Sequence, residues 1–188
     1  MGLTAGGSLP FYTFTTYAQK FLVNTSGFSK AQATSISFVV MAVALLFQPL
    51  FGAVSDKIGR RPVLLFFGIG ATLGTVPLLR LLAHTTEAGV ATGLLIAALF
   101  VVAGYTSINA VVKAELFPTE IRALGVGLPY ALTVAIFGGT AEYLALYAKN
   151  QGHEEWYYWY VAGCALLSLL VYWRMGDTRT TGRMTDTD

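Results

Sequence analysis

The sequence is poor in charge, and its charged residues nearly balance in sign. Only 12% of its 188 residues are charged, and the net charge is +2. A soluble domain usually carries about twice that share of charged residues. So little charge cannot cover a water-soluble globule, and a hydrophobic content of 55% excludes a disordered chain. The small net charge also excludes a nucleic-acid partner. These figures indicate an integral membrane protein.

Cysteine and histidine are scarce as well. The one cysteine, Cys164, excludes a disulfide framework and a thiolate zinc cluster. His84 and His153 lie in polar links, so an intramembrane protease of the serine–histidine or metal type has no histidine to use. Neither G-x-S-x-G nor a G-x-x-x-x-G-K-[ST] phosphate loop occurs. We therefore expect a protein that is not an enzyme and that uses no metal and no cofactor.

Long apolar stretches are what the sequence does contain. A membrane helix needs roughly 20 mostly apolar residues. Six such stretches run near residues 3–24, 31–55, 62–83, 88–113, 122–148 and 156–174. The links are short, which favours antiparallel neighbouring helices. We expect an all-α integral membrane protein in which residues 1–176 form one bundle of six transmembrane helices. A polar, disordered tail is expected at 177–188.

The distribution of basic residues predicts the orientation. Eight of the 12 lysines and arginines lie in the second link, at the edges of the fourth link, or at and after the end of the last stretch. Cytoplasmic loops carry the excess of such residues, so both termini and the tail are expected in the cytoplasm. The first stretch begins with no basic flank and no cleavable signal, as in a chain that starts at the midpoint of a longer one. Pro10, Pro77 and Pro129 fall inside stretches and should kink them.

The link between the second and third stretches carries residues with distinct physical roles. Gly52 would permit close helix contact, and Gly59 a tight reversal. Asp56 can lie at the positive end of a neighbouring helix or pair with an arginine. Arg60 and Arg61 hold the link in the cytoplasm. Contacts of this kind can form in one conformation and break in another, which predicts a latch; a plain positively charged turn is the alternative.

The link between the fourth and fifth stretches offers partners for that latch. Glu115 and Arg122 are placed for a cytoplasmic charge network with Arg60 or Arg61. The alternative is a solvated link with unrelated charges. Thr119 is expected to oppose the free N–H groups at the start of the fifth helix.

These motifs resemble those of a known family. G-x-x-x-D-K-x-G-R-R at 52–61 and E-x-F-P-T-x-x-R at 115–122 resemble loop motifs of the major facilitator superfamily of secondary transporters. Residues 11–17, 22–25 and 137–143 narrow the resemblance to the metabolite:proton symporter branch. Members have two six-span halves, and this chain resembles the second. The six helices are therefore expected to form one half of that fold, with a separate six-helix first half as partner.

The resemblance implies a function as well. It implies import of α-ketoglutarate or a similar dicarboxylate together with protons, by alternating access, across the bacterial inner membrane. Its partners would be the organic anion, protons and the lipid bilayer. Three alternatives stay open: betaine or proline as the solute, a shikimate-like or other organic acid, and a remnant that transports nothing.

Polar residues inside the stretches are candidates for solute binding. If the family arrangement holds, the first and fourth stretches line a central cavity. Two i,i+4 pairs on the first stretch and one on the fourth share helix faces. The substrate-binding candidates are Tyr12, Thr16, Tyr17, Gln48, Tyr105 and Asn109. Alternatively, they bond to neighbouring helices, as polar residues in membrane bundles commonly do.

Ionisable residues at membrane depth complete the set of candidates. Glu142, in the fifth stretch, could be a proton site or a gating partner; the alternative is a carboxylate that reaches the interface. A dicarboxylate near the bilayer midplane needs cationic partners. No lysine or arginine lies near the middle of a stretch, and Lys113 falls in a link. We therefore expect the main cationic ligands to come from the first half.

Overall fold

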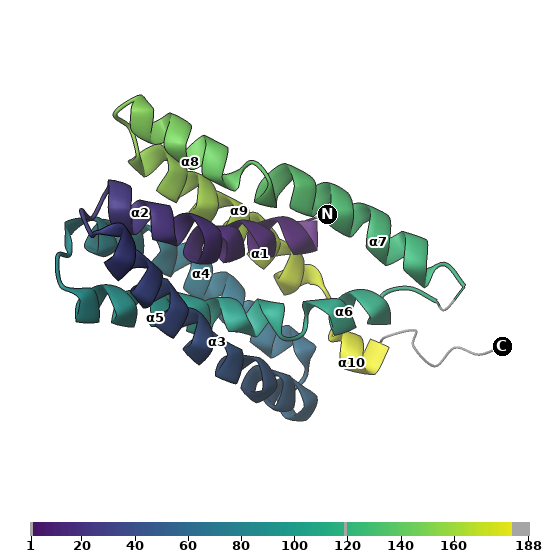
Figure 1. Cartoon of the computed structure of the whole chain (residues 1–188). Helices are drawn as coiled ribbons and strands as arrows, with labels where there is room; N and C mark the ends of the chain where they lie inside the picture. Colours follow the sequence, from purple (N-terminus) through teal and green to yellow (C-terminus); the bar gives the residue numbers. More distant parts are fainter. Residues whose placement is uncertain (1, 119, 182–188) are drawn as a thin grey trace.

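The computed structural model describes residues 2–118 and 120–181, and their regular structure is entirely helical (Figure 1). Helices α1 (Gly2–Tyr12) and α2 (Ala18–Asn24) are joined by a π-helical turn, η1 (Thr13–Tyr17). Helices α3 (Lys30–Ile58) and α4 (Arg60–His84) follow, and then α5 (Ala88–Thr106) with α6 (Asn109–Glu115). Helices α7 (Arg122–Thr133) and α8 (Ala141–Asn150) are joined by a second π-helical turn, η2 (Val134–Gly138). Helices α9 (Glu155–Arg174) and α10 (Thr178–Thr181) end the described chain.

These elements form six helical rods within the described residues, close to the six expected stretches. Four rods are long and apolar enough to cross a membrane: Lys30–Ile58, Arg60–His84, Ala88–Glu115 and Arg122–Asn150. The first rod and α9 do not meet this criterion. The first rod contains threonines, a glutamine and a lysine, and α9 begins with a run of tryptophan and tyrosine; all of these lower the mean hydropathy. Length and hydropathy therefore identify four spans where the sequence pattern predicts six.

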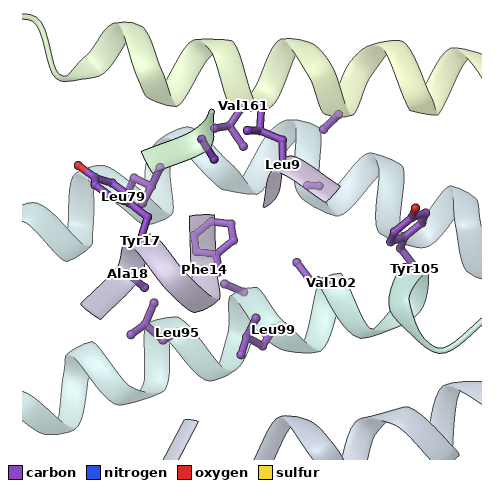
Figure 2. Close-up of a cluster of buried hydrophobic side chains, with 14 of the residues drawn as sticks. Leu9, Phe14, Tyr17, Ala18, Leu79, Leu95, Leu99, Val102, Tyr105 and Val161 are labelled. Carbon is purple, nitrogen blue, oxygen red and sulfur yellow. The ribbon is translucent and has the colours of Figure 1, made fainter. Parts of the chain in front are cut away.

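The first rod, although polar in composition, lies at the centre of the bundle. Every residue from Leu3 to Pro10 is buried. Figure 2 shows Leu9 and Phe14 of this rod among side chains of α4, α5 and α9, such as Leu79, Leu99 and Val161. The central position explains the composition, because a helix enclosed by other helices needs no apolar surface toward lipid.

Small residues let α1 approach α9 closely. A Cβ atom on Gly6 would lie 2.8 Å from the Cα atom of Ala165, so only glycine fits there. The Gly6 N–H donates to the Ser168 hydroxyl at 2.9 Å, and the Tyr172 hydroxyl donates to the Leu3 carbonyl at 2.8 Å. These bonds tie the first two turns of α1 to α9.

Two of the three expected kinks become π-helical turns. Pro10 and Pro129 precede η1 and η2 by a few residues, and each lacks the N–H that a regular helix would use. The Thr133 hydroxyl donates to the Pro129 carbonyl at 2.6 Å. Pro77, by contrast, lies within an unbroken α4. A π-helical turn rotates the residues that follow it around the helix axis. The α-helical spacing that would place Tyr12 and Thr16 on one face therefore does not apply here.

Candidate functional site

An ion cluster joins the ends of α3, α4 and α6. The Arg60 guanidinium donates to Asp56 Oδ1 at 2.6 Å, to the Ser55 hydroxyl at 2.7 Å and to Glu115 Oε1 at 3.4 Å. The side chains of Arg60 and Glu115 are only 13% and 8% exposed. We call Ser55, Asp56, Arg60 and Glu115 the Arg60 cluster. It connects the link after α3 to the link after α6.

The C-terminal segment closes this cluster. The Thr178 hydroxyl donates to Glu115 Oε2 at 2.5 Å, and Asp177 Oδ1 accepts the Arg60 backbone N–H at 3.1 Å. Arg179 donates to the Lys57 carbonyl, at the end of α3, at 3.0 Å. An acid at a helix start and a cation at a helix end both complement the helix dipoles. The expectation of a disordered tail from residue 177 is therefore wrong for Asp177–Arg179. Residues 182–188 of the expected tail lie outside the described residues, as does Thr119.

Gly59 is the residue that allows this closure. Its φ of +101° is one that side chains rarely adopt. A Cβ atom there would also collide with the carboxylate of Asp177. The predicted tight reversal is therefore present, and it makes room for the C-terminal segment.

Besides Gly59, three residues that the sequence assigned to the latch lie outside the cluster. Around Gly52, the described residues leave open space where a Cβ would be, so the expected close helix contact is absent there. Arg61 donates to the Trp173 carbonyl at 2.7 Å. Arg122 donates to the Phe117 carbonyl at 3.2 Å. Arg122 therefore takes no part in the Arg60 cluster in this structure, because its guanidinium bonds to a carbonyl of its own link.

A cavity of about 220 Å³ lies between α1, the break from α5 to α6, and α7. Three of the substrate-binding candidates, Tyr12, Tyr105 and Asn109, line it. The other lining residues are Ser8, Phe11, Thr106, Tyr130 and Val134. The fourth rod is interrupted at 107–108, so Thr106 and Asn109 both face this cavity from the two sides of the break. The expected pairing of Tyr105 with Asn109 is present.

Lys113 is the functional candidate that the sequence reasoning missed. It is only 7% exposed. Its Nζ lies 2.9 Å from Asn109 Oδ1, 3.3 Å from the Tyr105 hydroxyl and 4.1 Å from the centre of the Tyr130 ring. All three neighbours line the cavity. This chain therefore holds a buried cation beside the cavity, although the sequence pattern assigns the main cationic ligands to the first half. The spacing of Tyr105, Asn109 and Lys113 by four residues was the available signal.

Two glycines leave the space that two aromatic rings of the cavity wall occupy. A Cβ atom on Gly7 would collide with the ring of Tyr105, and one on Gly138 with the ring of Tyr12. Gly138 lies in η2, which packs against α1. These glycines carry no chemistry, and no spacing pattern singles them out from the chain's 20 glycines.

The remaining candidates lie elsewhere. Thr16 is exposed. Tyr17 is 2% exposed and donates to Glu154 at 3.4 Å, and Figure 2 shows it at the opposite end of the apolar cluster from Tyr105. Gln48 accepts a hydrogen bond from Thr106 at 3.1 Å and lines a second hollow of about 340 Å³. Thr106 borders both spaces.

Glu142 forms an ion pair with Lys20 between α8 and α2. The two side chains are 35% and 50% exposed, respectively. The carboxylate is thus paired and accessible rather than enclosed. The pair ties the fifth rod to the first.

Comparison with known proteins identifies the family. The model of the sugar (and other) transporter family, part of the major facilitator superfamily, matches residues 11–181. The chain belongs to this transporter family. The chain is 52% identical over 171 residues to the alpha-ketoglutarate permease of Escherichia coli K12, and the match covers 91% of this chain and 40% of the permease. No solved structure matches it.

More distant relatives are also transporters. The citrate-proton symporter of Klebsiella pneumoniae is 26% identical over 93% of this chain and 40% of the symporter. The proline/betaine transporter of Escherichia coli K12 is 24% identical over 95% of the chain and 35% of that protein. The chain therefore spans about two fifths of the length of these relatives. None of these relatives is named as an enzyme.

Proposed function

We propose that this chain is the second half of a proton-coupled symporter that imports α-ketoglutarate or a similar dicarboxylate by alternating access. The observation that carries the proposal is the cavity between α1, α5 and α7, which is lined by hydroxyl and amide groups and has the Lys113 ammonium bonded to one of its lining residues, Asn109. Such groups suit a carboxylate solute. The 52% identity to an alpha-ketoglutarate permease supports that solute class.

Exposed apolar faces support a membrane location and a six-helix first half as partner. In α3, Phe38 is 76% exposed and Leu45 70% exposed; in α7, Leu124 is 78% exposed. Such faces need lipid or further helices to cover them. We propose the bacterial inner membrane as the location, as the family indicates, with both termini in the cytoplasm.

We also propose that the first rod and α9 cross the membrane, giving six spans. Trp156 and Trp159 at the start of α9 and Trp173 at its end are 61%, 59% and 64% exposed. Tryptophan gathers at both membrane–water interfaces, so exposed tryptophans at the two ends suit a spanning helix. The first rod runs beside α9 through the same bundle (Figure 1).

In this proposal the Arg60 cluster is the cytoplasmic latch. Its bonds join three helix ends and the C-terminal segment, so they hold one arrangement of the bundle and must change in another. Transporters of this kind rock one bundle against the other around a central site. The Lys20–Glu142 pair is the proposed proton-coupled contact, because protonating Glu142 removes its attraction for Lys20.

The test is uptake of labelled α-ketoglutarate by cells that lack their own permease. The cells carry this chain alone, the first half of the E. coli permease alone, or both, with membrane expression confirmed. We expect uptake only with both halves, and its loss when a protonophore collapses the pH gradient. Stronger inhibition of the labelled uptake by unlabelled citrate or betaine than by unlabelled α-ketoglutarate would assign a different solute. Absence of uptake of any of these solutes would indicate a remnant.

Gly138→Ala is expected to weaken the apparent affinity for the solute about tenfold, which corresponds to about 1.4 kcal/mol. The added methyl displaces the Tyr12 ring from the cavity wall. Gly127→Ala in the same rod is the control, because a Cβ there meets nothing within 4 Å. The measurement is the KM of uptake for both variants at equal membrane expression. Equal KM values for the two variants would mean that the position of the Tyr12 ring does not affect solute binding.

A further inference from the structure

We infer that the Lys113 ammonium binds one carboxylate of the transported anion, and this inference rests on the proposed function. The starting observation is a buried cation without an acidic partner. Within residues 2–118 and 120–181, Lys113 takes part in no ion pair. Its contacts are the neutral oxygens of Asn109 and Tyr105 and the faces of the Tyr105 and Tyr130 rings.

Other cations of this chain bond to carboxylates, whereas Lys113 does not. Arg60 pairs with Glu115 and Asp56, and Lys20 pairs with Glu142. Two further pairs, Arg80–Glu155 and Lys149–Glu154, also join a cation to a carboxylate. Lys113 is 7% exposed and is surrounded by neutral groups only. Burying a charge is costly unless an opposite charge compensates for it. An anion in the neighbouring cavity would supply that compensation.

The geometry leaves the ammonium able to bind such an anion. A lysine ammonium has three N–H donors. Two of them are directed to Asn109 Oδ1 and the Tyr105 hydroxyl, so one remains. The ring of Tyr130 covers one side of the charge at 4.1 Å from Nζ. The three neighbours all line the cavity, so the ammonium lies directly behind this part of the cavity wall.

The arrangement also limits what this chain recognises. Among the described residues, no lysine or arginine lines the cavity itself, and Lys113 is the cation bonded to its wall. One ammonium pairs with one carboxylate, so the other carboxylate of a dicarboxylate must be bound by groups outside this set. Loss of the ammonium should therefore weaken binding of the anion as a whole without changing the preference between dicarboxylates of similar length.

The experiment measures equilibrium binding of labelled α-ketoglutarate to this chain assembled with the first half of the E. coli permease in vesicles without gradients. We expect Lys113→Gln to raise Kd at least tenfold and Lys113→Arg to retain part of the affinity, because it keeps the charge. Lys57→Gln, which removes an exposed lysine, is the control and should leave Kd unchanged. An unchanged Kd in Lys113→Gln would overturn the inference.

A second measurement uses the unaltered chain, so it does not depend on the folding of a variant. An amine-acylating reagent is applied with and without α-ketoglutarate, and labelled lysines are identified by mass spectrometry. We expect α-ketoglutarate to protect Lys113 and to leave the labelling of Lys57 unchanged. Binding of α-ketoglutarate without protection of Lys113 contradicts the inference alone. Absence of any binding by the assembled, unaltered protein contradicts the proposed function itself.

Discussion

Replacing Arg60 with glutamine is expected to lower the free energy of unfolding by about 3–5 kcal/mol, because it leaves a buried carboxylate without its cation. Glu115 is the residue left without its cation; its side chain is 8% exposed and, among the described residues, would keep the hydrogen bond from the Thr178 hydroxyl. Asp56 also loses its partner, but at small cost because its side chain is 67% exposed. Transport should fall with the loss of the cluster. Denaturant unfolding in detergent and α-ketoglutarate uptake measure the two effects.

Two companion variants separate the buried charge from general damage. Arg60→Gln combined with Glu115→Gln should regain much of the lost stability, because no buried charge remains unpaired. Arg80→Gln removes an arginine from an ion pair whose side chains are 48% and 55% exposed. It should cost less than about 1 kcal/mol. Equal losses in Arg60→Gln and Arg80→Gln would show that burial of the cluster contributes nothing.

Gly6→Leu is expected to destabilise the bundle by about 3 kcal/mol or more, at the upper end of overpacking effects. The first atom of the new side chain would lie 2.8 Å from the Cα atom of Ala165, and backbone cannot move aside as a flexible side chain can. The shift would also stretch the bond from the Gly6 N–H to Ser168, now 2.9 Å. Because α1 is enclosed by the other helices, its displacement disturbs the cavity as well.

Gly163→Leu, on the opposite helix α9, is the matched control. A Cβ there meets nothing within 4 Å, so the change should stay within about 0.5 kcal/mol. The thermal midpoint of each variant in detergent and the amount inserted in the membrane provide the comparison. Similar midpoints for Gly6→Leu and Gly163→Leu would mean that α1 and α9 are not held at the close approach described.

The features that the sequence alone determined are local ones. Scarcity of charge and six apolar stretches predict a helical membrane protein. The helices lie close to the expected bounds, because the change from apolar to polar residues along the sequence marks where each one begins and ends. Gly59 adopts a positive φ that depends on its own lack of a side chain. Asp56 pairs with Arg60 one helical turn away in sequence. The loop motifs at 52–61 and 115–122 indicate the transporter family without any knowledge of tertiary contacts.

Tertiary structure alone decided the features that depend on which helix faces meet. The sequence pattern places Lys113 at a link between two stretches. Its burial beside the cavity depends on the packing of α6 against Tyr130. Thr178 reads as the start of a polar tail, and only the fold brings it to Glu115, 63 positions earlier in the chain. Local composition carries no information on contacts over such separations, because they are set by the packing free energy of the whole bundle.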